Sequence, residues 1–162
     1  MEGKQEVLEL LAREGIPFEL TEHPAVFTVA DVRALGIPHH EYGAKNLFLR
    51  DDKKRAYYLV SLPEEKRVSL KEIQARIGSR RLSFASEADL LAKLGLTPGS
   101  VTPLGALNDA AHTVEVVIDQ ALWDRGRVAV HPCDNTATVL LATRDLVELL
   151  RDHGSPVRVI AL

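Results

Sequence analysis

Residues 113–142 read TVEVVIDQALWDRGRVAVHPCDNTATVLLA and contain three runs with the composition of β-strands. The runs lie at 113–119, 128–131 and 136–142, and each is built on aliphatic or β-branched residues. Short apolar runs bounded by turn residues are typical of strands. Because these strands follow in close order rather than in strict β–α–β alternation, the sequence predicts an α+β fold. We expect a mixed, curled, partly barrel-like sheet surrounded by helices.

Elements on both sides of this stretch complete the expected fold. Helices are predicted where apolar residues recur with helical spacing between a capping residue and a glycine. The Thr28 hydroxyl and the Ser69–Glu72 pair are expected to cap two of them. The segment 97–105, with two prolines and two glycines, is predicted to be a loop with a defined path. The predicted helices are 7–11, 28–36, 69–78, 86–94 and 144–153, and the other predicted strands are 18–20, 45–50, 56–60, 82–84 and 157–160.

Length and composition fit one domain spanning residues 1–162. Of the 162 residues, 46% are hydrophobic and 27% are charged, which supports a real core and excludes a disordered tail. The single cysteine, Cys133, excludes an internal disulfide and a multi-cysteine zinc site, so a reducing, cytoplasmic location is expected. No apolar run approaches the roughly 18–20 residues that span a membrane. The polar N-terminus does not resemble a signal peptide.

Charge is distributed as a basic middle segment on an acidic body. The net charge is −3, yet residues 45–81 hold eleven Lys and Arg against five Asp and Glu, a local balance of +6. The rest of the chain holds nine against eighteen, a balance of −9. Such a segment suits a protein that grips one small part of a polyanion. Solvated hairpin and helix surfaces also explain these charges, and from charge alone this second interpretation is preferred.

Well-known catalytic signatures are missing from the sequence. It has no G-x-S-x-G elbow, H-E-x-x-H helix, P-loop or G-x-G-x-x-G turn, so any chemistry must need little machinery. Cys133 follows an apolar strand, where a lone cysteine is more commonly a small buried hydrophobe than a nucleophile. His39, His40 and Glu41 are adjacent on one loop and cannot easily converge on one ion, so no metal is expected.

Lys45 and two polar loops are candidates for binding, and each has a purely structural alternative. Lys45 begins an apolar strand directly after two small residues, which leaves room for a ligand. A lysine at a strand end also commonly just extends its ammonium group into solvent. The polar run 131–138 is either an ordinary turn between strands or the lining of a pocket, and the loop 99–103 has the same two interpretations.

Four segments match the motifs of one known family. They read EHPAVFTV at 22–29, AKNLFLR at 44–50, GSVTPLG at 99–105 and HPCDNTAT at 131–138. In this order and spacing they resemble the YbaK/ProX family, the domain associated with prolyl-tRNA synthetases, from about Glu14 to the C-terminus. The last segment is similar to that of the ProX branch, whereas the cysteinyl-tRNA(Pro) deacylase branch has a turn rich in glycine and arginine. Cys133 and Asp134 depart from the family's pattern, which bears on pocket shape.

The resemblance implies a metal-independent hydrolase that needs no cofactor and removes alanine from wrongly charged proline tRNA. An aminoacyl-tRNA ester is already activated, so the site needs only to position water and stabilise the oxyanion. The resemblance makes Lys45 the central polar residue, which binds either the carbonyl oxygen or the terminal phosphate and ribose. The other residues implied in substrate binding are Asn46, Val29, Leu47, Gly99, Pro103, Gly105, His131, Asn135 and Thr136.

Three of these groups have more specific expected roles. Val29, Leu47 and Pro103 are expected to form a wall that admits a methyl side chain and excludes the proline ring. Backbone N–H groups of the 99–105 loop are expected to donate to the substrate. His131 either contacts the substrate or braces its own loop.

The expected partners are the acceptor end of tRNA(Pro) and prolyl-tRNA synthetase, and the chain is expected to be a monomer or weak homodimer without membrane contact. Three alternatives stay open. The chain is a deacylase for Cys-tRNA(Pro) or another aminoacyl-tRNA, a non-catalytic module that binds tRNA or a synthetase, or an esterase or amidase for small acyl compounds. A deacylation assay and its dependence on tRNA separate them.

Overall fold

The computed structural model describes residues 3–162, apart from the side chain of Val29, and its strands form two sheets. The strands are β1 Phe18–Glu22, β2 Ala44–Asp51, β3 Tyr57–Pro63, β4 Leu82–Phe84, β5 Val114–Asp119, β6 Arg127–Val130, β7 Ala137–Ala142 and β8 Val157–Ile160. The larger sheet has the order β4-β2-β3-β5-β8, in which β5 runs parallel to both of its neighbours and the other pairs are antiparallel. The smaller sheet, β1-β7-β6, is antiparallel.

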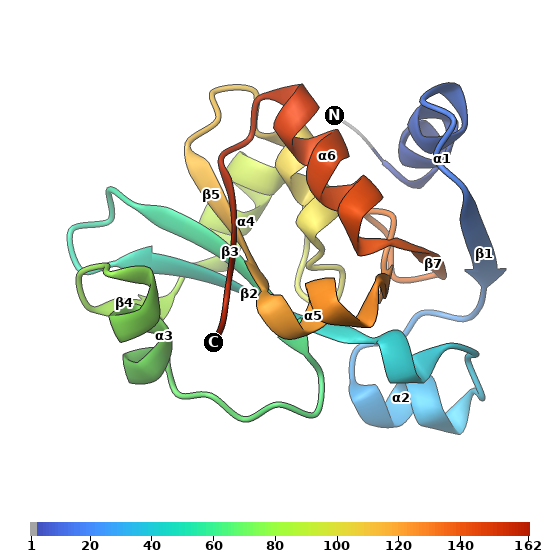
Figure 1. Cartoon of the computed structure of the whole chain (residues 1–162), viewed down its shortest axis with the longest axis horizontal. Helices are drawn as coiled ribbons and strands as arrows, with labels where there is room; N and C mark the ends of the chain where they lie inside the picture. The colour runs from blue at the N-terminus through green and yellow to red at the C-terminus, as the bar shows by residue number, and fades with distance from the viewer. Residues whose placement is uncertain (1–2) are drawn as a thin grey trace.

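Helices surround the two sheets (Figure 1). They are α1 Lys4–Arg13, α2 Val29–Ala34, α3 Leu70–Ile77, α4 Glu87–Leu94, α5 Gln120–Arg125 and α6 Thr143–His153, with short 3-10 helices η1 His40–Tyr42 and η2 Pro103–Asn108. The α+β class with a mixed sheet and outer helices is confirmed. None of the helices within residues 3–162 has the length and apolar composition needed to cross a membrane.

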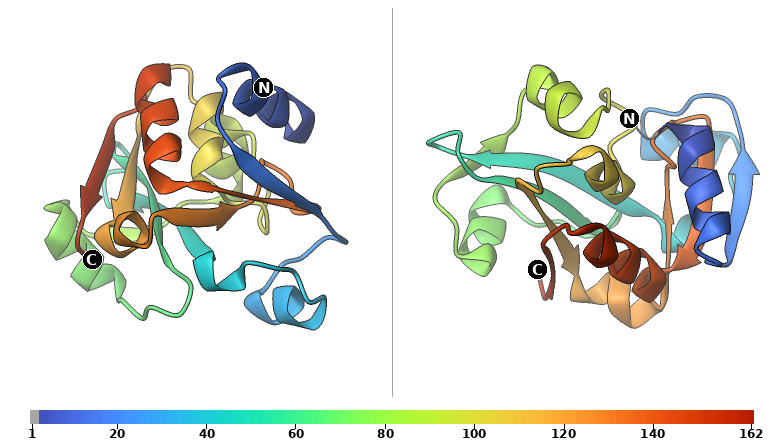
Figure 2. Two further views of the ribbon diagram at one scale, coloured as in Figure 1. Left: turned by 45° about the vertical axis from the view of Figure 1, so that its right-hand side comes forward. Right: turned by 90° about the horizontal axis from the view of Figure 1, so that it is seen from above.

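The strands expected in one curled sheet divide into two sheets that meet at a single bridge. Gly43, just before β2, bridges Ala129 in β6, and this contact sets the end of the larger sheet against the smaller one. Figure 2 shows β1 along the edge of the smaller sheet, where it pairs with β7. The division follows the strand pairing: β5 pairs with β3 and β8, whereas β6 and β7, which follow α5, pair with each other, and β7 also pairs with β1.

Side-chain alternation along β2 places different residues on the two faces of the larger sheet. Phe48 packs into the main core, which also contains apolar residues of α1, α4, α6 and the smaller sheet. Leu49 faces the other way, into a smaller core beneath α3 that includes Ile73 and Ile77. Lys45 therefore lies on the same face as Leu49, and Asn46 on the same face as Phe48.

Helix ends follow the expected capping signals. The Thr28 hydroxyl accepts the N–H of Asp31 at 3.1 Å and begins α2, and the Ser69 hydroxyl likewise caps α3. Gly78 ends α3 at φ +78°, a backbone conformation that glycine adopts without strain. Helix α5 and the 3-10 helices η1 and η2 were not predicted from the sequence, and the start of η2 falls within the predicted loop 97–105.

Candidate functional site

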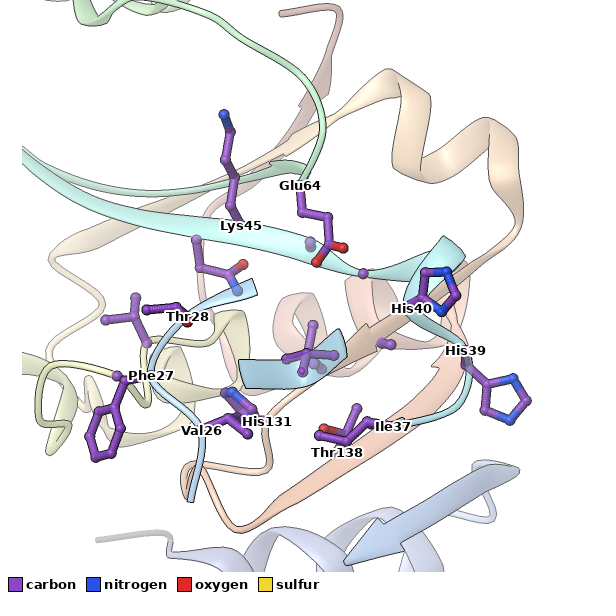
Figure 3. A pocket seen from close by; sticks show the side chains of 18 of the residues that line it. Val26, Phe27, Thr28, Ile37, His39, His40, Lys45, Glu64, His131 and Thr138 are labelled. Atoms are coloured by element: carbon purple, nitrogen blue, oxygen red, sulfur yellow. The ribbon is translucent and has the colours of Figure 1, made fainter. Parts of the chain in front are cut away.

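A cavity of about 290 Å³ lies where the two sheets meet (Figure 3). One side is formed by the segment before and within α2, another by the start of β2, and the floor by β6 and the polar turn after it. The lining residues are Val26, Phe27, Thr28, Val32, Ile37, Pro38, His39, His40, Gly43, Ala44, Lys45, Asn46, Glu64, Gly99, Val101, Ala129, Val130, His131 and Thr138. The cavity thus combines small apolar walls with a few polar groups.

The His131 ring is held in one orientation and one tautomer. Its Nδ1–H donates to the carbonyl oxygen of Ala137 at 2.8 Å, so in the neutral ring Nε2 carries the lone pair. Burial lowers the pKa of His131 below its usual 6.5, and nearby His23 lowers it further, while the bond to Ala137 opposes the shift. The lowered pKa favours the neutral imidazole at neutral pH, and Nε2 of the neutral ring is available to accept a hydrogen bond.

His23 and Thr138 extend this polar side of the pocket. His23 Nδ1–H donates to the carbonyl of Pro24 at 2.8 Å, and in the neutral ring Nε2 accepts from the Thr138 hydroxyl at 2.8 Å. The rings of His23 and His131 lie 6.2 Å apart between centroids. The Thr138 hydroxyl is thus oriented by a fixed partner and keeps its own lone pairs for the pocket that it lines.

Lys45 lines the pocket but extends its ammonium group away from His131 and Thr138 (Figure 3). Its Nζ donates to the carbonyl oxygen of Lys66 in the connection between β3 and α3. That connection is fixed in turn by Lys66 Nζ, which donates to the buried carboxylate of Asp119 at 2.8 Å. The Lys45 ammonium therefore has a defined position at the β3–α3 side of the pocket.

Asn46 points to the main-core face of β2 and also lines the pocket. Its Oδ1 accepts a hydrogen bond from the Ser61 hydroxyl at 2.6 Å, and Ser61 lies opposite it on β3. This bond orients the side-chain amide, and no residue within the described chain accepts a hydrogen bond from its Nδ2.

Gly99 shapes the mouth of the pocket. Its φ of +92° favours glycine, and a Cβ there would lie 2.6 Å from Cδ1 of Phe27. The absent side chain thus seats the Phe27 ring, whose residue is 68% exposed. Asn135 fixes the same segment: its Nδ2 donates to the carbonyl of Val26 at 2.9 Å, and its own carbonyl accepts the Val26 N–H.

Several predicted site residues lie outside the pocket lining. Pro103 and Gly105 are buried in η2; the Gly105 N–H donates to Thr102, and a Cβ at Gly105 would lie 2.6 Å from Leu96. Leu47 lines a second, neighbouring hollow. The Thr136 hydroxyl donates to the carboxylate of Asp134 within the turn and accepts from Nζ of Lys4 in α1. Val29 begins α2, and its side chain lies outside the part of the chain that the structure describes.

Cys133 and the His39–Glu41 loop, which were not favoured as a nucleophile and a metal site, have other contacts in the structure. Cys133 adopts φ +60° in the turn and packs against the main core, as expected for a packing role. His39 pairs with Glu19 at 3.4 Å, while His40 lies 3.9 Å from Glu41. Within residues 3–162 no three His, Cys, Asp or Glu side chains gather as a metal site would require.

Glu64 is an acidic pocket residue that was not predicted from the sequence. It follows the last residue of β3 and reaches the pocket because Pro63 pairs with Ala44 at the start of β2. Burial raises the pKa of its carboxyl group, an effect that the charges of Arg33, His40 and Arg125 oppose. The only sequence signal was an acidic pair, Glu64 and Glu65, directly after an apolar strand.

Comparison with known proteins identifies the family. The family model described as "Aminoacyl-tRNA editing domain" matches residues 23–149. The chain is 44% identical over 162 residues to the "Prolyl-tRNA editing protein ProX" of Acetoanaerobium sticklandii, covering 100% of this chain and 99% of that protein. It is 38% identical over 152 residues to the "Prolyl-tRNA synthetase associated domain-containing protein 1" of Bos taurus, covering 89% and 86%.

The fold also matches a crystal structure of a candidate trans-editing enzyme for prolyl-tRNA synthetase. The TM-score is 0.71 at 21% identity, over 96% of this chain and 94% of that one. These findings confirm the resemblance found in the four motifs and the expectation of a hydrolase acting on aminoacyl-tRNA: the chain belongs to the aminoacyl-tRNA editing domain family.

Proposed function

We propose that this protein removes alanine from mischarged tRNA(Pro) as a free-standing editing enzyme, without a metal or cofactor. The observation that carries the proposal is the neutral His131 ring, with a fixed tautomer, in a small cavity. The ProX editing protein of A. sticklandii, 44% identical over the whole chain, supports prolyl-tRNA as the substrate class. Aminoacyl-tRNA is used in the cytoplasm, where we expect the protein to act.

His131 Nε2 accepts a hydrogen bond from the attacking water in this proposal. The water oxygen bonds to the ester carbonyl carbon, and the resulting oxyanion accepts a hydrogen bond from Asn46 Nδ2. The bond from the carbonyl carbon to the ribose oxygen then breaks, and the proton taken up by His131 passes to that oxygen. The fixed Ala137 contact keeps the ring in the tautomer that this transfer needs.

Lys45 binds the terminal phosphate and ribose rather than the carbonyl oxygen. Its direction away from His131 and Thr138 supports this assignment. One of its three N–H donors is used by the Lys66 carbonyl, which leaves two for the substrate. The exposed Phe27 ring at the mouth offers a face on which a base of the single-stranded 3′ end stacks.

Selection by size follows from the apolar side of the cavity. Val26, Ile37 and Ala129 are buried residues that line it, and they take the place of Leu47 and Pro103 as the proposed wall. A hydrophobic pocket gains about 1–3 kcal/mol for each added methylene it can hold, so only a steric wall makes alanine a better substrate than proline.

Hydrolysis of tRNA(Pro) carrying alanine, cysteine or serine, beside alanine ethyl ester, tests the proposal. We expect alanine to be released fastest from tRNA and the ethyl ester to be a poor substrate. If cysteine is released fastest, Cys-tRNA(Pro) replaces Ala-tRNA(Pro) as the proposed substrate. Equal hydrolysis of the ethyl ester would indicate a general esterase. The absence of any hydrolysis would indicate a non-catalytic binding module.

A further inference from the structure

Glu64 is a carboxylate built into the pocket wall by the backbone around it. Its N–H donates to the carbonyl of Gly43 at 3.3 Å, which ties the end of β3 to the residue before β2. The side chain lies between Lys45 and His40 and points into the pocket (Figure 3). Among the described lining residues it is the one acidic side chain.

Gly43 provides the space that the Glu64 carboxylate occupies. The φ of Gly43 is −63°, which any residue adopts, so its backbone conformation does not call for glycine. A Cβ at this position would lie 2.5 Å from Glu64 Oε2 and 2.9 Å from Glu64 Cδ, and 3.0 Å from the carbonyl oxygen of His40. The carboxylate is therefore packed against the bare Gly43 backbone at the edge of the cavity.

The Glu64 carboxylate has no hydrogen-bond or ion-pair partner within the described chain, although neighbouring acids do. Glu65 pairs with Arg125, and Asp119 pairs with Lys66. A half-buried charge without a partner costs free energy that a bound cation offsets. The site thus has the charge and the exposure of a binding group for a small cation.

The substrate class supplies such a cation. An aminoacyl ester carries a free α-amino group one carbon from the carbonyl carbon that is attacked, and model α-amino groups have pKa values of about 7.7–8.0, so the group is largely protonated at neutral pH. Esters of a peptide or of an N-blocked amino acid lack this charge. A carboxylate beside the reaction centre distinguishes the two kinds of ester.

We propose that the Glu64 carboxylate binds the α-ammonium group of the ester-linked amino acid and makes the enzyme selective for a free amino group. The proposal rests on the proposed deacylase function and adds a specificity-determining residue to it. The ammonium, the methyl side chain and the carbonyl group are attached to the same carbon and point in different directions. With the ammonium at Glu64, the methyl group therefore faces the apolar wall and the scissile carbonyl faces His131. Peptidyl-tRNA is excluded by the same contact.

The test compares two isosteric esters on the same tRNA(Pro): alanine and lactate, in which a hydroxyl replaces the ammonium. Each enzymatic kcat/KM is divided by the spontaneous hydrolysis rate of that ester, which removes the difference in intrinsic reactivity. The wild type is expected to prefer the alanyl ester by about tenfold or more, as for a charged hydrogen bond. Glu64→Gln is expected to lose this preference by slowing alanyl hydrolysis alone.

Two further variants separate binding from other roles. Glu65→Gln makes the same chemical change at the adjacent residue, whose exposed side chain pairs with Arg125. This variant is expected to keep the wild-type preference for the alanyl ester. Glu64→Asp retains the negative charge on a side chain that is shorter by one methylene. Its preference for the alanyl ester is expected to lie between those of the wild type and Glu64→Gln. Thermal unfolding of each variant shows whether it is folded.

The outcomes are distinct. Loss of the preference in folded Glu64→Gln, with Glu65→Gln unchanged, supports the inference. Equal slowing of both esters by Glu64→Gln, or an unchanged preference, overturns it while the deacylase function stands. If the wild type hydrolyses neither ester, the proposed function fails, and this inference fails with it.

Discussion

At the scale of single residues, the pocket is assembled from positions that lie far apart in the chain. Lys45, Asn46, Gly99 and His131 lie in matched motifs, and they line one cavity although up to 86 residues separate them, counting from 45 to 131. Glu64 lies in no motif, and only the pairing of β2 with β3 brings it there. Sequence patterns alone do not distinguish residues that bind from residues that pack.

His131→Asn is expected to lower kcat/KM for alanyl-tRNA by about 100-fold or more, since it removes the acceptor Nε2. The asparagine amide still has an N–H with which to reach the Ala137 carbonyl, so the turn is expected to stay folded. Deacylation rates and a thermal melt check both statements. A rate within threefold of wild type, which corresponds to about 0.7 kcal/mol in the activation barrier, would show that His131 only stabilises its loop.

The wild-type rate is expected to fall as the pH drops through a value under 6.5, because burial lowers the pKa of His131 and the neutral ring is the active form. The stability of the fold is expected to change in the same direction. As the pH falls, the histidine of the unfolded chain takes up its proton at a higher pH than the buried ring does. The free energy of unfolding is therefore highest above pH 6.5 and declines below it. His131→Asn is expected to lose the acid limb of the rate profile. An unchanged acid limb in that variant contradicts the assignment.

Lys45→Ala is expected to abolish measurable deacylation while leaving the chain folded. The variant loses one hydrogen bond to the Lys66 carbonyl, worth about 0.5–1.5 kcal/mol of stability, and the charge proposed to bind the phosphate and ribose. Denaturant unfolding and single-turnover rates measure the two effects separately. If Lys45→Ala retains activity within threefold, the ammonium has no part in the reaction.

At the scale of elements, helix boundaries were predictable because caps are local. Thr28, Ser69 and Gly78 act as the sequence indicated. Helix α5 was missed because it has only six residues between two strands, although Asp119 and Gly126 at its ends carried a capping signal. The start of η2 was taken for loop because its prolines and glycines are the same residues that break longer helices.

Asp119→Ala is expected to destabilise the protein by about 2–4 kcal/mol, since it leaves a partly buried lysine without its counter-charge. The Asp119 carboxylate is 1% exposed and also accepts the N–H groups of Ala121 and Leu162, at 3.3 and 3.2 Å. The control is Glu148→Ala, which removes an exposed pair with Arg144 and is expected to cost under about 0.5 kcal/mol. Equal costs in denaturant unfolding would refute the structural role of Asp119.

At the scale of the whole molecule, local patterns predicted the α+β class, while the division into two sheets depends on distant pairing. β1 pairs with β7 across more than 100 residues, since Phe18 lies opposite Leu141. No short-range signal specifies such a partner. The cavity exists because the two sheets meet at Gly43 and Ala129, so the site is a consequence of this long-range arrangement.

Selection by the size of the cavity is tested by the ratio of alanyl to prolyl hydrolysis on the same tRNA(Pro). Ile37→Val trims the wall by one methylene, and Ile77→Val makes the same change at equal exposure, 6%, in the core beneath α3. We predict that the wild type hydrolyses the alanyl ester and spares the prolyl ester, that Ile37→Val narrows this ratio, and that Ile77→Val leaves it unchanged. Rapid hydrolysis of the prolyl ester by the wild type would show that the cavity does not select its substrate by size.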